Sequence, residues 1–480
     1  MKTGAQPSRR VFLGSALALP HILASTDRRP NILYALADDW MWPHASIRGD
    51  PVVKTPTFDR VASRGVLFSN AFVTAPSCTP SRASMLTGQW HWRLERGANL
   101  SGTLSAKFPT YPDLLGAAGY HVGFMRKGWG PGKLTDSGRT NNPAGPHFQD
   151  FASFLAERPK GQPFCFWFGS VDPHRPYEWE SGVNSGMRLE DVRVPPYLPD
   201  CEAIRKDICD YYWKVQRYDR ETGELLAMLQ ETGELDNTIV VMAGDNGWPF
   251  PRCKATVYET GTHTPLVISW PDRIKPGRVV DDFVSHADLA PTFLEVAGLT
   301  PSAQVTARSL LPVLLSDKSG YVDPRRDHVL TGMERHVPCR GASKGGYPMR
   351  AIRTREFHYI RNFTPDRWAA GDPGTEPYTY EQLATDTRVA FADVDAGPSK
   401  AYMVLHRDDP EVKPLFERAF GKRPAQELYD LRSDPWQMRN VADDPQYATA
   451  RKRLDGQLTA ELKATGDPRI TGQGAVFETD

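Results

Sequence analysis

Four short, strongly apolar runs place the tightest constraint on how this chain can fold. They lie at residues 30–37, 164–168, 238–243 and 265–270. Runs of this length and composition are typical of strands that are buried on both faces of a parallel sheet. Helical patterns alternate with them, at residues 57–64, 81–86, 111–118, 207–230 and 288–297. We therefore expect an α/β fold with helices on both faces of the central sheet.

The pattern changes in the last third of the chain, which at 480 residues is too long for one small domain. Residues 347–362 alternate as strands do, residues 427–430 resemble a further strand, and residues 447–464 form an amphipathic helical pattern. This predicts a larger domain at residues 28–335 and a smaller α+β domain at residues 336–480.

The N-terminus predicts export. Ser8-Arg9-Arg10 precedes a modest apolar run that ends near Leu19, a pattern similar to a twin-arginine-type signal at residues 1–27. The alternative is a disordered basic tail. The apolar run is too short to cross a bilayer, so we expect no transmembrane segment and a periplasmic or extracellular protein. The formal net charge of zero gives no reason to expect binding to nucleic acid.

Polar residues directly follow three of the predicted strands. Asp38-Asp39, Asp245-Asn246 and His174 occupy these positions. Ligands of open α/β sheets bind beyond the carboxyl ends of the strands, so these side chains are expected to converge. Carboxylate and amide oxygens suit Ca²⁺ or Mg²⁺ better than zinc.

Cys78 precedes a predicted helix. Pro80 is typical of a first helical turn, and Arg82 lies four residues after Cys78, so both side chains can meet where a helix N-terminus attracts anions. From these residues alone, Cys78 is either a nucleophile or a plain buried cysteine.

A family resemblance carries the interpretation further. Residues 78–88 resemble the type I sulfatase signature C-x-P-S-R-x-x-x-L-T-G, and the similarity extends to residues 36–39, 244–247, 288–292 and 427–430. It implies an alkaline-phosphatase-like fold, with a mixed, mostly parallel sheet and a small antiparallel C-terminal sheet. It also implies that a maturation enzyme oxidises Cys78 to formylglycine (3-oxoalanine), whose hydrated aldehyde attacks sulfur.

The resemblance implies roles for the other site residues. One Ca²⁺ would be bound by Asp38, Asp39, Cys78 in its oxidised form, Asp245 and Asn246. Arg82 would stabilise the aldehyde hydrate, Lys127 and Lys254 would hold sulfate oxygens, and His174 would protonate the leaving group.

The sequence departs from the family at Trp129, which stands where sulfatases commonly have a histidine. The family histidine assists the aldehyde hydrate. His174, His263 or a loop residue are the open alternatives for this role.

Four segments are more similar to the N-sulfoglucosamine sulfohydrolase (sulfamidase) group than to arylsulfatases: residues 172–175, 194–200, 245–251 and 347–350. The implied substrate is the N-sulfo group of glucosamine in heparan sulfate or heparin-derived saccharides. His336, Arg340 and Arg350 are candidate sugar-binding residues, with scattered surface charge as the alternative. The rival functions are a sugar O-sulfatase, a phosphate or phosphonate ester hydrolase of the same superfamily, and a catalytically silent sugar-binding protein.

Overall fold

The computed structural model describes residue 1, residues 28–341 and residues 345–478. The expected signal at residues 1–27 lies outside the described residues, apart from residue 1, and stays a prediction. Within the described ranges, every helix is too short or too polar to cross a lipid bilayer.

Seven strands form the central sheet, in the order β3-β4-β1-β5-β6-β2-β7. Their bounds are β1 Asn31–Ala37, β2 Val66–Phe72, β3 His121–Arg126, β4 Phe164–Gly169, β5 Thr238–Gly244, β6 Leu266–Ser269 and β7 Arg278–Ser285. Neighbouring strands are parallel, except that β6 runs antiparallel to both β5 and β2. The sheet is therefore mixed and mostly parallel, as the family resemblance implied.

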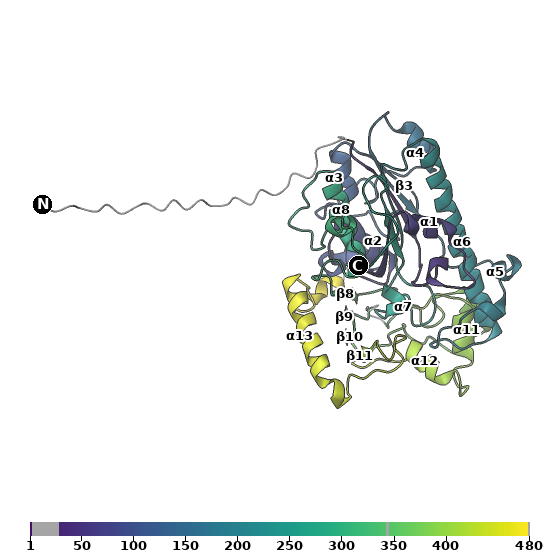
Figure 1. The fold of residues 1–480 in the computed structure, drawn as a ribbon. Helices are drawn as coiled ribbons and strands as arrows, with labels where there is room; N and C mark the ends of the chain where they lie inside the picture. The colour runs from purple at the N-terminus through teal and green to yellow at the C-terminus, as the bar shows by residue number, and fades with distance from the viewer. Residues whose placement is uncertain (2–27, 342–344, 479–480) are drawn as a thin grey trace.

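Helices cover both faces of this sheet (Figure 1). Leu33 and Ala35 of β1 belong to one apolar core, and Ile32 and Tyr34 belong to the core on the opposite face, as the period of a strand requires. The first core packs beneath α1 Pro56–Ser63, α4 Phe151–Glu157 and α6 Glu202–Glu231, and the second beneath α2 Cys78–Thr87, α3 Tyr111–Ala117 and α8 Leu289–Val296. Each helix predicted in this part of the sequence is present. Shorter helices are α5 Ser181–Asn184, α7 Glu259–Thr262 and α9 Leu311–Leu314.

A second, antiparallel sheet has the order β11-β10-β9-β8. Its strands are β8 His328–Met333, β9 Met349–Thr354, β10 Phe357–Asn362 and β11 Gln426–Asp430. The closing helix α13, Ala448–Ala464, packs Leu454, Leu458 and Leu462 into the core that this sheet shares. The predicted small C-terminal sheet is thus confirmed. The domain division at residue 336 stays a prediction. The first strand of this sheet, β8, lies before that residue.

The chain leaves the second sheet between β10 and β11 and returns to the first. It forms α10 Tyr380–Thr385, α11 Pro398–Leu405 and α12 Lys413–Phe420. α11 packs against α6, and its residues Ala401, Met403 and Val404 belong to the core of the larger sheet. The loop between α10 and α11 is thereby held close to the carboxyl ends of the central strands.

Arg350 on β9 joins the second sheet to the C-terminal segment. It is fully buried, with Nε 2.6 Å from Asp467 Oδ2 and a terminal nitrogen 2.5 Å from a carboxylate oxygen of Glu334. Its guanidinium carbon lies 5.2 Å from the centre of the Trp92 ring. Removing one partner of a buried ion pair leaves an uncompensated buried charge, which is strongly destabilising.

We expect Arg350→Met to lower the free energy of unfolding by about 3–5 kcal/mol, because Glu334 and Asp467 would lose their shared cation. Arg325→Met is the matched control, since the Arg325 side chain is 75% exposed. Chemical denaturation followed by tryptophan fluorescence measures both. Equal losses in the two variants would contradict the structural role of Arg350.

Candidate active site

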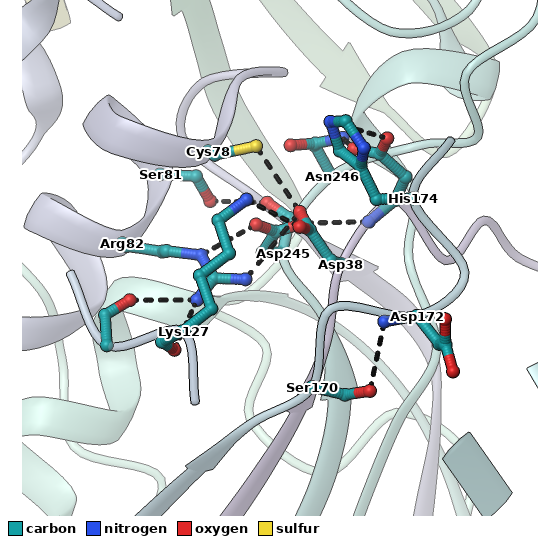
Figure 2. A network of polar contacts seen from close by, with 12 residues as sticks. Asp38, Cys78, Ser81, Arg82, Lys127, Ser170, Asp172, His174, Asp245 and Asn246 are labelled. Carbon is teal, nitrogen blue, oxygen red and sulfur yellow. Dashed lines mark hydrogen bonds and ion pairs between the residues drawn. The ribbon is translucent and has the colours of Figure 1, made fainter. Parts of the chain in front are cut away.

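The site forms where β1 and β5 end side by side. Ala37 pairs with Gly244 across these strands, so Asp38 and Asp39 emerge next to Asp245. One ligand atom from each of these carboxylates and from Cys78 can be chosen so that all four lie within 4.8 Å of one another. Figure 2 shows the side chains of Asp38, Asp245 and Cys78 gathered in the polar network. The expected convergence of residues that follow different strands is therefore present.

Helix α2 delivers two further side chains to the cluster. Cys78 is its first residue, after Ser77 as the N-cap, and its Sγ donates to Asp38 Oδ1 at 3.3 Å. Arg82, one turn later, is fully buried and places Nε 2.7 Å from Asp245 Oδ2. The four-residue spacing therefore brings both side chains to the same cluster of carboxylates.

Two lysines complete the charge balance. Lys127 Nζ lies 2.5 Å from Asp38 Oδ2. Lys254 Nζ lies 2.8 Å from Asp39 Oδ2 and 3.0 Å from Asp395 Oδ2. Buried carboxylates are costly unless they are paired, so these ammonium groups stabilise the cluster.

His174 follows β4 and borders the cluster. Its Nδ1 lies 2.5 Å from the carbonyl oxygen of Arg175, which makes Nδ1 the protonated nitrogen of this hydrogen bond. Its Nε2 lies 3.8 Å from Asp39 Oδ2, and the side chain is one-third exposed. The imidazole thus has one nitrogen held by the backbone and the other facing the cluster.

Burial and charge shift the proton affinities in this site. Burial opposes the ionisation of Asp38, but Lys127 and the other nearby cations outweigh it and hold the pKa of Asp38 well below its usual value. Burial, with the Asp38 charge, raises the pKa of Asp245 to about 6. Burial and Asp38 also raise the pKa of the Cys78 thiol well above its usual value. Since the thiolate is the reactive form, the unmodified sulfur is a poor nucleophile here.

Three residues around the cluster have left-handed backbone conformations without being glycine. Asp39 has φ 69°, Arg126 before Lys127 has φ 59°, and Ala255 after Lys254 has φ 63°. This conformation is unfavourable for a residue with a Cβ, and such strain concentrates at functional sites. The backbone is therefore distorted where it presents one carboxylate and both lysines.

The residues present fit a divalent cation. Three carboxylates supply hard oxygen ligands, and the amide oxygen of Asn246 is buried without a hydrogen-bond partner among the described residues. Its amide nitrogen donates to Asp39 Oδ1 at 2.7 Å, so the Asn246 side chain lies at the cluster. A buried polar atom that lacks a partner is uncommon, and a divalent cation would supply one for this oxygen.

The three expected sugar-binding residues have different surroundings. His336 is buried and its Nδ1 lies 2.8 Å from Ser77 Oγ, next to the start of α2. Arg340 is buried and paired with Asp393. Arg350 is fully enclosed in the ion pairs described above, so we do not include it in the proposed substrate site.

Trp129, at the position of the missing histidine, is buried against the loop that follows β3. Of the alternatives, His263 is held between Glu259 and the Ser69 carbonyl and is stacked on Phe72. His174 is the alternative that lies at the cluster.

Asp395 is the residue that sequence reasoning missed. It lies in the α10–α11 loop, far along the chain from the strands, and no motif surrounds it. Asp39, His174 and Asp395 offer ligand atoms within 4.8 Å of one another.

Two cavities flank His174. The larger, about 710 Å³, is lined by Asp38, Lys127, Trp129, His147 and Lys214. The smaller, about 390 Å³, is lined by Tyr177, Trp179, Asp207 and Asp395. Both volumes are in the range of small-ligand sites.

Residues 30–299, more than half of the chain, match the family profile described as Sulfatase. The chain belongs to the sulfatase family. Residues 244–392 match a second profile, described as N-sulphoglucosamine sulphohydrolase, C-terminal.

Known proteins agree with this assignment. N-sulphoglucosamine sulphohydrolase of Homo sapiens is 28% identical to this chain, across 96% of this chain and 95% of the relative. An ulvan-active sulfatase of Formosa agariphila is 26% identical, across 92% of this chain and 76% of the relative.

Solved structures share the fold. A structure in complex with its substrate D-glucosamine-2-N,6-O-disulfate has a TM-score of 0.66 at 21% identity and covers 92% of this chain and 99% of its own. The phosphonate monoester hydrolase of Agrobacterium radiobacter has a TM-score of 0.66 at 18% identity, with 91% and 96% covered. The alkaline-phosphatase-like, mostly parallel sheet is thus common to this chain and its neighbours.

We expect Ca²⁺ or Mg²⁺ to raise the thermal unfolding midpoint of chelator-treated protein by several degrees. A ligand at one hundred times its Kd stabilises the folded state by about 2.7 kcal/mol. Asp39→Asn should remove most of this increase, because it deletes one hard ligand. Differential scanning fluorimetry measures the midpoints.

Asp236→Asn is the control for this experiment, since Asp236 is exposed and precedes β5, whereas Asp245 follows the other end of that strand. An equal cation response in Asp39→Asn and Asp236→Asn would show that the ion binds elsewhere.

Proposed function

We propose that this sulfatase removes the N-sulfo group from glucosamine residues of heparan sulfate or heparin-derived saccharides. Membership of the sulfatase family, together with relatives named for sugar sulfates, supports sulfatase activity on sulfated sugars. The observation that carries the proposal is the position of Cys78, 3.3 Å from Asp38 inside a cluster of three carboxylates that is neutralised by Arg82 and two lysines.

Two groups complete the proposed site: formylglycine at position 78 and one Ca²⁺ held by Asp38, Asp39, Asp245, Asn246 and residue 78. When bound and formed, they supply a hydrated aldehyde as the nucleophile and a Lewis acid that polarises oxygen. The hard oxygen ligands and the unpaired Asn246 amide oxygen support the ion.

The chain's own cations bind and orient the sulfo group. Lys127 and Lys254 lie against Asp38 and Asp39, on two sides of the carboxylate cluster, and each ammonium has N–H donors left for sulfo oxygens. Arg82 holds Asp245 through Nε and does not release its proton, so its charge is permanent. Fixed positive charge lowers the barrier where negative charge develops.

His174 is the proposed proton donor to the leaving nitrogen. Its Nδ1 is engaged by the Arg175 carbonyl, which leaves Nε2 to face the cluster. Hydrolysis breaks the S–N bond, water supplies the oxygen of the released sulfate, and the nitrogen leaves as an amine that becomes an ammonium. A protonated histidine at this position can donate the proton that the leaving nitrogen takes up as the S–N bond breaks.

Three observations support the N-sulfo group over other sulfates. The second family profile, at residues 244–392, is that of the N-sulphoglucosamine sulphohydrolase C-terminal region. The human relative of that name aligns over nearly the full length of both chains. The segments at 172–175, 194–200, 245–251 and 347–350 resemble the same group.

A sugar O-sulfatase is the second candidate, because an N-acetylglucosamine-6-O-sulfatase of Bacteroides thetaiotaomicron is 25% identical over 73% of this chain. The phosphonate monoester hydrolases share the fold, so phosphonate esters belong in the same test. A silent sugar-binding protein would turn over none of these compounds.

Two cellular requirements accompany the proposal. A formylglycine-generating maturation enzyme acts on Cys78, and a twin-arginine-type signal exports the chain to the periplasm or beyond. The support for both comes from the sequence, through the signature at residues 78–88 and the Arg9-Arg10 pair.

We expect the peptide that contains Cys78 to be about 18 Da lighter than its sequence mass in active protein, because an aldehyde replaces the thiol. Mass spectrometry of a tryptic digest measures this shift. Cys78→Ala should reduce turnover to background while keeping the fold. Cys165→Ala is the control, since Cys165 is buried in β4. Full activity in Cys78→Ala would refute the proposed nucleophile.

A substrate panel tests the specificity. Matured enzyme should hydrolyse N-sulfoglucosamine with a kcat/KM at least about tenfold above that for 6-O-sulfated N-acetylglucosamine and for an aryl phosphonate ester, a difference of about 1.4 kcal/mol in the barrier. Ion chromatography of released sulfate measures the sugars. Faster turnover of the O-sulfate would assign the chain to the second candidate function.

A further inference from the structure

The smaller cavity beside His174 has features of a sugar site. Its volume is about 390 Å³, and Trp179 on its wall is 52% exposed. An exposed indole offers a large apolar face with a polar edge, which suits a sugar ring.

Asp395 lines this cavity and lies next to the cluster. Its Oδ2 accepts from Lys254 Nζ at 3.0 Å, whereas its Oδ1 has no hydrogen bond within residues 28–341 and 345–478. The side chain is 15% exposed. A carboxylate oxygen on the lining of a cavity can accept a hydrogen bond from a bound ligand.

The position of Asp395 relative to Lys254 and His174 indicates which part of the substrate it would contact. The Lys254 ammonium bridges Asp39 and Asp395, at 2.8 and 3.0 Å. His174 lines the cavity from the same side as Asp395, and ligand atoms of both lie within 4.8 Å of Asp39. A group that leaves the sulfur next to His174 therefore emerges beside the Asp395 carboxylate.

We propose that the smaller cavity binds the leaving sugar ring and that Asp395 pairs with its amino nitrogen. This inference rests on the proposed function and names the residue that recognises the amine. Hydrolysis of the S–N bond converts a sulfamate nitrogen into an ammonium, and a carboxylate pairs well with an ammonium. The same carboxylate repels a second sulfate or a carboxylate at that place, which gives selectivity by charge.

The wall that holds Asp395 is braced by a buried ion pair. Asp207 of α6 accepts from both terminal nitrogens of Arg175, at 2.8 and 2.7 Å. It also accepts from Ser399 Oγ at 2.6 Å, at the start of α11. Bidentate pairs of this kind fix geometry, so the loop carrying Asp395 is tied to the segment carrying His174.

Binding of three unsulfated sugars tests the inference without requiring turnover. D-Glucosamine below the pKa of its amine, N-acetylglucosamine and D-glucose are titrated into full-length protein by ligand-observed NMR. Wild type should bind glucosamine about tenfold more tightly than the two neutral sugars, as expected for a charge-assisted hydrogen bond. Asp395→Asn should remove this preference and leave the affinity for D-glucose within about twofold.

Two further variants complete the design. Trp179→Ala should weaken all three sugars to a similar extent, because stacking does not depend on the amine. Glu381→Gln is the control, since Glu381 is exposed on α10, near the same loop. Equal thermal midpoints establish that each variant is folded, and the wild-type preference is informative by itself.

The outcomes separate the two proposals. An amine preference that disappears in Asp395→Asn, in a protein that does not hydrolyse N-sulfoglucosamine, supports the binding site and overturns the proposed function. Hydrolysis of N-sulfoglucosamine with no amine preference in wild type, or with a preference that Asp395→Asn retains, overturns the role of Asp395 and leaves the proposed function intact.

Discussion

The electrostatic requirement of three buried carboxylates governs the rest of this structure. Asp38, Asp39 and Asp245 lie together because β1 and β5 are neighbours in a parallel arrangement, and they are enclosed by protein on nearly every side. Like charges in such a place need cations from elsewhere. Arg82 from α2 and Lys127 from beyond β3 come from separate segments, so the fold is organised around the end of the sheet.

Much of the fold could be predicted from hydrophobic pattern alone, because central strands buried on both faces are uniformly apolar. The runs at 30–37, 164–168 and 238–243 became β1, β4 and β5. Strands β2, β3 and β7 were not predicted, since each is interrupted by partly exposed or charged residues. The antiparallel direction of β6 could not be predicted either, because an apolar run has the same composition whichever way its strand points.

The site was predictable where it coincides with strand ends and with the helix start at Cys78. Asp395 could not be found in this way, because it reaches the cluster through the packing of α11 on α6, and no local pattern encodes that contact. For Arg350, the sequence predicted a substrate contact that its surroundings do not support. Its charge suggested an anion-binding role, but its burial against Glu334 and Asp467 depends on residues far away in the chain.

The Asp207 brace joins two parts of the molecule that come from different segments of the chain. The carboxylate cluster comes from the ends of the central strands, next to α2, whereas one wall of the smaller cavity comes from residues 386–397, inserted between strands of the second sheet. Substitutions in that insertion can alter the shape of the smaller cavity without disturbing the carboxylate cluster, provided that Asp395 and the Arg175–Asp207–Ser399 link are kept. Divergence within such a scaffold, or its redesign in the laboratory, therefore has a defined segment on which to act.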